Sequence, residues 1–347
     1  MTKRSSGSRW GRLLAILLAT TALVACGDDE EPSASPGAQT PPPAADTLTV
    51  QAGMNDPQDR NIAVTEFLPE AVTIVAGKSV EWQIPGPEPH SVTFLPPGQQ
   101  LPPPGSDESL FAPTPPTGPF DGKTLVNSGL VPLGPTAAAP FKVTFSTPGR
   151  YTYYCVIHPQ MTGTVTVVDA AGRADAQTDV NSRAEAEKAR WLAEGQAAKK
   201  RLVDAAPVVE RAADGTSTYK VEMGATTEHT DVLAFDRPEL DLKVGDRVTF
   251  VNNSQAPHTA SFAGRTTLPQ DPTSPAVGTP APGPSPQTLN STDFFNTGLL
   301  PPNAGPPGSI PPEPARSFTF VVRTPGEYPY VCLLHVPSGM GGRLKVA

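Results

Sequence analysis

Short stretches in which apolar and polar residues alternate recur along the chain and predict β-strands. The clearest are residues 72–75 and 240–244, followed by the apolar runs 141–145 and 318–322. Alternation with a period of two places every second side chain on one face of a sheet. Gly or Pro ends most of these stretches, as expected of turns between strands. The pattern therefore predicts an all-β fold, and the 44 prolines and 30 glycines agree with it.

The strand pattern occurs twice with the same residues at the same spacing. Each copy has a phenylalanine, a glycine ten positions later and a histidine thirteen positions after the glycine: Phe67, Gly77 and His90, then Phe235, Gly245 and His258. Two further pairs of segments match, 127–130 with 296–299 and 147–155 with 324–332. So many aligned points indicate a tandem duplication, with several short strands per copy forming one β-sandwich.

One segment between the copies has the composition of a helix. Ser182 and Glu185 form a capping-box pattern, and helix-forming residues follow. We expect a helix over about 183–205, which either separates two domains or packs on one of them through Trp191 and Leu202. The proline-rich loops 96–140 and 264–316 are assigned no regular structure.

The first 25 residues have the pattern of an export signal. A basic start is followed by an apolar run too short to span a bilayer, which ends at Ala25-Cys26-Gly27. This ending resembles the bacterial lipobox, in which the cysteine is lipidated and becomes the mature N-terminus. The alternative is an ordinary signal peptide with a nearby cysteine. We expect an exported protein, lipid-anchored at Cys26 to the bacterial membrane and facing the periplasm or the cell surface.

These patterns divide the chain into five parts: signal peptide 1–25, flexible tether 26–46, first domain 47–169, helical linker 170–207 and second domain 208–347. The formal net charge is -8, and no basic stripe is present to neutralise phosphates. We therefore expect no nucleic-acid partner, and membrane attachment through lipid rather than through anionic head groups.

Each copy carries one cysteine, two histidines and one methionine in the same order. These are His90, Cys155, His158 and Met161 in the first copy, and His258, Cys332, His335 and Met340 in the second. A thiolate, two imidazoles and a weak axial thioether form the donor set of a type 1 (blue) copper site. Such a set binds both Cu(I) and Cu(II), so it can pass one electron with little rearrangement. The residues predict two copper sites.

The spacing of these ligands resembles the plastocyanin/azurin family of cupredoxins, twice in one chain. Cys-x-x-His-x-x-Met has the short amicyanin-like length, and Cys-x-x-His-x-x-x-x-Met has the plastocyanin-like length. The resemblance covers about 47–169 and 208–347. It implies two Greek-key cupredoxin sandwiches whose His158 and His335 lie near the surface, where electrons enter or leave beside an apolar face at Pro159, Val336 and Pro337.

Other interpretations of these residues explain less. A disulfide between Cys155 and Cys332 leaves the histidines and methionines without a role, and structural zinc sites do not use a thioether. Met161 and Met340 could be core residues, although both occur at ligand spacing. Asn127 and Asn296 either order a loop near the metal or simply form turns, and the sequence leaves this open.

The function most consistent with the ligands is electron transfer between redox proteins of a respiratory or other chain. Two-domain copper oxidases and nitrite reductases need further histidines, whereas this chain has five and four are ligands. The fifth, His229, is expected on the surface. We therefore expect no enzyme activity. Copper binding, sensing or delivery at the cell surface uses the same ligands and remains the alternative.

Overall fold

The computed structural model describes residues 46–104, 106–132, 139–269, 274–278, 285–289, 292–303 and 310–347. The expected signal peptide, Cys26 and nearly all of the tether lie outside these residues. The described residues belong to one compact unit. Among their helices, none is long and apolar enough to cross a membrane. Most of the regular structure is β-sheet, as the alternating pattern predicts, which agrees with an all-β fold.

The first half of the described chain, before the long helix, contains nine strands and one short 3-10 helix. They are β1 (Thr47–Asn55), β2 (Ile62–Leu68), β3 (Ala71–Val75), β4 (Ser79–Gln83), β5 (Thr93–Phe94), η1 (Glu108–Phe111), β6 (Val126–Asn127), β7 (Phe141–Thr144), β8 (Gly149–Tyr154) and β9 (Thr162–Val168).

The second half follows α1 (Gln177–Asp204) and repeats this order with additions. Its elements are β10 (Val209–Arg211), β11 (Ser217–Thr226), β12 (Thr230–Phe235), β13 (Glu239–Leu242), β14 (Arg247–Asn252), β15 (Ser261–Phe262), α2 (Pro275–Gly278), β16 (Gln287–Leu289), β17 (Phe295–Asn296), η2 (Glu313–Arg316), β18 (Ser317–Val322), β19 (Gly326–Val331) and β20 (Gly341–Val346).

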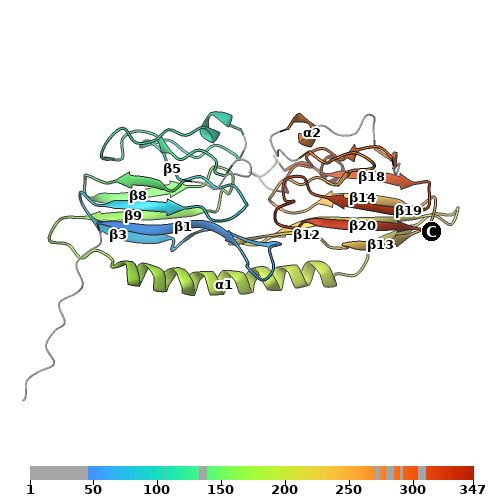
Figure 1. Cartoon of the computed structure of the whole chain (residues 1–347), viewed down its shortest axis with the longest axis horizontal. Coiled ribbons are helices and arrows are strands. Elements are labelled where there is room, and N and C mark those ends of the chain that lie inside the picture. The colour runs from blue at the N-terminus through green and yellow to red at the C-terminus, as the bar shows by residue number, and fades with distance from the viewer. Residues whose placement is uncertain are drawn as a thin grey trace, which may run out of the picture. The chain divides into compact units, whose positions relative to one another are not determined.

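Each half has its own five-stranded sheet, and the two sheets have corresponding strand orders. The orders are β3-β9-β8-β5-β6 and β13-β20-β19-β15-β17, with the first pair of each parallel and the other pairs antiparallel. The remaining strands of both halves form one continuous sheet along the path β16-β18-β14-β11-β12-β2-β1-β4-β7. Its middle is the antiparallel pair β2–β12, where Ala63 faces Asp231. Backbone pairing thus connects the two halves (Figure 1).

Two separate hydrophobic cores fill the halves, and aromatic pairs occupy matching positions in them. In the first core the ring centroids of Phe67 and Tyr153 lie 4.5 Å apart, edge to face. In the second, Phe235 and Tyr330 lie 4.8 Å apart in the same arrangement. The residue spacing that the two copies share therefore corresponds to the same aromatic packing in both halves.

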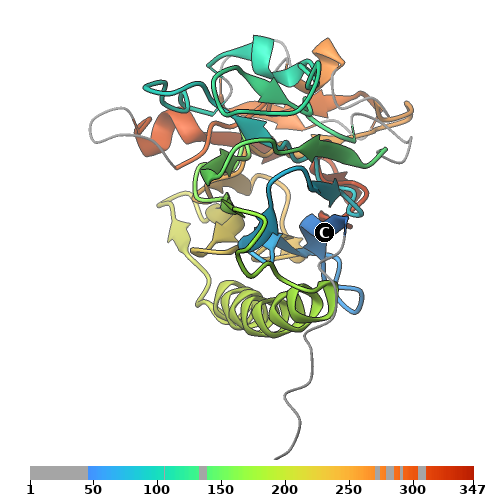
Figure 2. The ribbon, with the colours of Figure 1, turned by 90° about the vertical axis from the view of Figure 1, so that its left-hand side faces the viewer.

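Helix α1 packs along the strands where the two halves join, and the turned view shows it covering one side of them (Figure 2). Trp191 is buried against Val64 and Leu68 of β2, and Leu202 packs with Val232 of β12. Of the two alternatives for this helix, packing is the one observed. Strand β2 is consequently buried along its whole length, whereas β1 keeps an alternating pattern.

The helix begins at Gln177, several residues before the expected capping box. Its first turn is fixed by tertiary contacts: the side chain of Gln177 accepts from Thr49 N at 2.8 Å, and Asp175 pairs with Arg183 at 2.7 Å. Ser182 lies inside the helix and donates to the carbonyl of Thr178. The capping-box interpretation was therefore wrong, because contacts with the sheets determine where the helix starts.

The long loops contain more structure than expected. Helix η1 and strand β6 lie within 96–140, and α2, β16, β17 and η2 lie within 264–316. Asn127 ties η1 to β6 by donating to the carbonyls of Leu110 and Ala112 at 2.7 and 3.1 Å. Side-chain hydrogen bonds therefore order parts of these proline-rich segments that periodicity does not reveal.

Candidate metal centres

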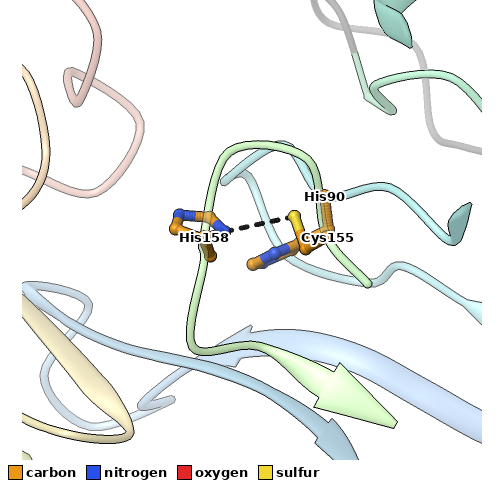
Figure 3. A group of neighbouring side chains, drawn as sticks. All are labelled: His90, Cys155 and His158. Atoms are coloured by element: carbon orange, nitrogen blue, oxygen red, sulfur yellow. Dashed lines mark hydrogen bonds between the residues drawn. The ribbon is translucent and has the colours of Figure 1, made fainter. Parts of the chain in front are cut away.

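In the first half, three candidate ligands come from the end of one strand, the loop that follows it and a distant segment of the chain. His90 lies between β4 and β5, where it exchanges backbone hydrogen bonds with Val131 at 2.9 and 3.0 Å. Cys155 directly follows β8, and His158 lies on the tight loop to β9. The three side chains meet with one donor atom from each within 4.8 Å of the others (Figure 3).

The distances in this first group fit a common ion. Cys155 Sγ lies 3.4 Å from His158 Nδ1, and the rings of His90 and His158 are 4.9 Å apart. His90 is 1 % exposed, and its Nδ1 has no hydrogen-bond partner among the described residues. A buried nitrogen without a partner is costly unless something binds it. The group is therefore incomplete as a purely structural cluster.

The second half repeats this group with His258, Cys332 and His335, all buried. Cys332 Sγ lies 3.7 Å from His258 Nδ1 and 3.2 Å from His335 Nδ1, and the two Nδ1 atoms are 3.2 Å apart. Donors bound to one ion at about 2.0–2.3 Å can be no more than ~4.6 Å apart. All three separations satisfy this limit.

The two methionines that the sequence analysis assigns as axial ligands lie at the ends of the loops. Met161 and Met340 are buried and belong to the same hydrophobic cores as Cys155 and Cys332. In each loop the cysteine N–H donates to the methionine carbonyl, at 3.1 Å in the first half and 3.0 Å in the second. These bonds close the loops, so each methionine stays beside its cysteine although the loops differ in length.

A buried chain of hydrogen-bonded hydroxyl groups supports the loop that follows each cysteine. In the first half Val156 N donates to Ser91 Oγ at 2.9 Å, Ser91 contacts Thr93 at 3.0 Å, and Thr93 donates to Asn127 Oδ1 at 2.8 Å. The second half repeats this arrangement: the corresponding residues are Leu333, Thr259, Ser261 and Asn296, linked at 2.9 Å in each step. Both asparagines therefore support the cysteine loop, and Asn127 also accepts from Gly129 N in a local turn.

The charges in the groups favour metal-binding forms of the cysteines. Burial raises the pKa of the Cys155 thiol, but His158 and backbone N–H groups lower it more, so its pKa lies below the usual value. Burial also raises the pKa of Cys332, but His335 and His258 lower it more, so its pKa lies well below the usual value. Backbone N–H groups of Ser91 and Thr259 point at the two sulfurs, each at 3.4 Å. Thiolates are the form that binds copper.

The histidines differ between the halves. Burial lowers the pKa of His90 to about 4, against the opposing effects of Glu88 and Asp231. Burial also acts on His335, but the Cys332 thiolate and then Glu88 outweigh it and raise the pKa to about 9. The lowered pKa of His90 favours its neutral, metal-binding form, whereas the raised pKa of His335 favours an ion pair with the Cys332 thiolate, and a bound metal would take the place of that proton.

Two glycines that the sequence analysis did not identify make room for the first histidine of each group. Gly53 and Gly224 lie at irregularities in β1 and β11 with φ of +65° and +72°. A Cβ on Gly53 would lie 1.9 Å from His90 Nε2, and one on Gly224 would lie 2.6 Å from His258 Nε2. A glycine bulge thus lets the backbone approach the imidazole closely. The glycine-to-histidine spacing differs between the halves, which hides the correspondence.

The second group is in contact with the first half of the chain. Asn61 donates to the carbonyl of Ser338 at 2.9 Å, and the Ser338 hydroxyl donates to Glu88. Glu88 Oε2 also lies 3.5 Å from His335 Nε2. These contacts cover His335, which is 6 % exposed, while His158 is partly exposed. The surface position that the resemblance implies for His335 is therefore wrong, although Pro159, Val336 and Pro337 are exposed as expected.

His229 also differs from its expected place on the surface. Its ring stacks on Trp191 at 5.1 Å, and its Nδ1 lies 3.0 Å from Glu194 Oε2. It belongs to neither of the two cysteine-containing groups. Cys155 and Cys332 are both free and buried in their own cores, so each remains available as a ligand.

The donor sets fit copper better than other common ions. Each group combines a thiolate and two imidazole nitrogens, with a thioether in the same core, and soft sulfur donors select copper over harder cations. The unpartnered His90 Nδ1 and the converging Nδ1 atoms of His258 and His335 leave metal-binding atoms directed at one another. The residues present therefore fit a copper ion in each half.

Comparison with solved structures finds partial similarity to amicyanins and plastocyanins. The amicyanin of Paracoccus versutus is 22% identical, with 38% of this chain and 86% of that chain aligned at a TM-score of 0.23. Oxidized plastocyanin from Dryopteris crassirhizoma is also 22% identical, with 37% and 99% aligned at 0.23. No family model and no curated protein sequence matches the chain. Both alignments cover less than two fifths of this chain.

Proposed function

We propose that the chain transfers electrons through two type 1 copper sites, one in each of two cupredoxin domains joined by α1. The first site would consist of His90, Cys155, His158 and Met161, and the second of His258, Cys332, His335 and Met340. The observation that carries the proposal is the repeated convergence of a buried cysteine Sγ and histidine nitrogens within 4.8 Å.

The surrounding residues support one-electron chemistry at such sites. When bound, each copper would supply the Cu(I)/Cu(II) couple. The chain's own contribution is a rigid pocket: hydroxyl chains fix both cysteine loops, backbone N–H groups point at both sulfurs, and glycine bulges set the first histidines. A fixed ligand geometry reduces the rearrangement that accompanies a change in oxidation state. These features suit an electron carrier.

The burial of the second group favours contact of redox partners with the first group. His158 is partly exposed beside the exposed Pro159, whereas Glu88 and Ser338 cover the ring edge of His335. We therefore place the docking of a redox partner protein at the first site. The second site would exchange electrons with the partner through the first site. Export and lipid anchoring at Cys26, with no nucleic-acid partner, form part of the same proposal.

Copper content and the visible spectrum test the proposal directly. We expect two coppers per chain and an intense blue absorption, with Cys155→Ser and Cys332→Ser each removing one copper and about half of the colour. Colourless protein, or a single bound copper, would show that at least one group is not a type 1 site. Loss of both sites in either single variant would contradict two independent sites.

A delivery protein would give the same spectrum but different kinetics. A carrier should keep both coppers through repeated oxidation and reduction in the presence of a copper chelator. Rapid loss of copper on reduction, at rates that match transfer to an acceptor protein, would favour delivery instead.

A further inference from the structure

A third group of potential ligands lies apart from the eight residues assigned to copper. Glu66 in β2, Glu70 in the turn after β2, and His229 in the turn before β12 each offer one donor atom, all within 4.8 Å of one another. The group joins the central strands of the two halves at the point where α1 covers them. Its donors are two carboxylate oxygens and one imidazole nitrogen.

Glu66 has a buried carboxylate oxygen that a purely structural role does not explain. It is 3 % exposed, and its buried Oε2 has no hydrogen-bond partner among the described residues. Burial raises its pKa to about 9, and the charged groups that raise it further are all anions, led by Glu70, Glu228 and Glu194. A buried carboxylate among other carboxylates is costly without a compensating cation.

The His229 ring is held in place by a carboxylate and by an aromatic ring. Its Nδ1 is 3.0 Å from Glu194 Oε2, which leaves Nε2 as the ring nitrogen available to an ion. Trp191, which is fully buried, stacks on the ring with an interplanar angle of 12°. The His229 carbonyl also accepts from Thr65 N at 2.9 Å. A carboxylate that binds the second nitrogen of a histidine is a common support for metal ligation, since it fixes the tautomer.

We propose that Glu66, Glu70 and His229 bind a divalent transition-metal ion of the Zn²⁺ class, with Glu194 as the positioning residue for His229. Two carboxylates and one imidazole suit such an ion, which is commonly held by three protein ligands. Ca²⁺ takes six to eight oxygen ligands and fits this group poorly. Bound there, the ion ties β2 to the turn before β12 and so strengthens the junction between the halves.

The test is a Zn²⁺ titration of the full chain after its cysteine-containing sites are filled with Cu(I). Cu(I) prefers sulfur donors and leaves the carboxylate group free. We expect one further equivalent of zinc by calorimetry and by metal analysis after desalting. Zinc-edge absorption should show imidazole and oxygen donors without sulfur. If Cu(I) does not load, the Cys155→Ser/Cys332→Ser variant is titrated instead, so failure of the copper proposal is recorded separately.

Variants then assign the zinc to this group. Glu66→Gln and His229→Ala should each abolish the additional equivalent, and Glu194→Gln should weaken zinc affinity by about 10–100-fold. Glu185→Gln, an exposed carboxylate on the same helix, is the control and should bind zinc normally. Metal-free Glu66→Gln should melt no lower than the unmodified chain, which shows that it is folded. Absence of the additional zinc, sulfur in its first shell, stronger binding of Ca²⁺, or retention of zinc by Glu66→Gln would overturn the proposal.

Discussion

The carboxylate of Glu88 lies 3.5 Å from Nε2 of His335, although Glu88 is only two positions before His90 in the chain. A residue next to a proposed ligand of one copper site therefore contacts a proposed ligand of the other. The matched position in the second half is Ala256, so the contact is not repeated. Nδ1 of the same His335 ring faces Cys332, so Glu88 acts on the outer nitrogen of the ligand.

This contact should lower the reduction potential of the second site. An anion beside a ligand stabilises Cu(II) relative to Cu(I), because Cu(II) carries the larger charge. We expect Glu88→Gln to raise the midpoint potential of the second site by tens of millivolts, measured in the Cys155→Ser background. Glu108→Gln, which changes an exposed carboxylate of the first half, is the control. An unchanged potential in Glu88→Gln would show that the contact has no electronic effect.

The glycine beside His90 gives a second prediction, with a matched control in the same half. Gly53→Ala should displace the His90 ring, since the new Cβ would lie 1.9 Å from Nε2. Gly77 also has positive φ, at +86°, but a Cβ there meets nothing within 4 Å. Gly77→Ala should therefore incur only the backbone cost of about 1–2 kcal/mol.

The two variants separate the contact from the backbone strain. Gly53→Ala should lose the blue absorption of the first site and keep that of the second, while Gly77→Ala keeps both. The measurement is the visible spectrum with copper analysis, alongside urea denaturation. Full colour in Gly53→Ala, with the same stability as Gly77→Ala, would mean that the ring does not depend on this close approach.

The sequence alone predicted the strands and the Cys/His residues that come together, because both depend on short-range, repeated patterns. Cys155 and His158 are three residues apart on one loop, and the same spacing recurs at Cys332 and His335. A tight loop after a strand brings such a pair together whatever the rest of the chain does. His90 and His258 lie far from their cysteines along the chain. They were identified because each follows a glycine by thirteen positions in its copy of the repeat.

The features that the sequence analysis missed depend on contacts between the halves or between distant strands. Glu88 reaches His335 because β2 pairs with β12, and no periodicity encodes that pairing. His229 appeared isolated along the chain, yet the same pairing and α1 place it beside Glu66 and Glu70. Helix α1 starts early for a similar reason, because sheet residues satisfy its first turn.

Replacing Asn61 tests how far the contacts between the two halves support the second site. Its amide donates to the carbonyls of Leu233 and Ser338 at 3.0 and 2.9 Å, and its Oδ1 accepts from Lys199 at 2.9 Å. Asn61→Ala removes these hydrogen bonds, although Lys199 keeps its ion pair with Asp59, and should lower the free energy of unfolding by about 1–3 kcal/mol. It should also alter the spectrum of the second site more than that of the first.

The control for Asn61 is an asparagine that makes no contact between the halves. Asn181 is exposed on α1 and accepts from Gln177 of the same helix. Asn181→Ala should change the free energy of unfolding by less than ~0.5 kcal/mol. Equal effects of the two variants in urea denaturation would show that the junction hydrogen bonds contribute no more than an exposed one.

Asp236 should make the stability of the metal-free chain depend on pH. Burial raises its pKa to about 6, and Glu222 adds to this, while backbone N–H groups and Arg237 oppose it. Because the folded-state pKa is above the unfolded value of 3.8, the folded chain favours the protonated carboxyl. The contribution of Asp236 to stability is therefore full below about pH 4 and is lost as the pH rises through about 6.

Asp236→Asn should remove this dependence, because the amide keeps the shape of the carboxyl without its charge. Its amide oxygen can still accept the hydrogen bond that Glu222 N donates to Oδ1 at 2.9 Å. Relative to the unmodified chain, the variant should gain stability between pH 4 and pH 7, by at most about 3 kcal/mol for a shift of two pKa units. Urea denaturation of both proteins across this range measures the difference, in which all other titrating groups cancel. A difference that stays constant with pH, or that favours the unmodified chain increasingly at pH 7, would show that Asp236 is ionised in the folded state at its usual pKa or below.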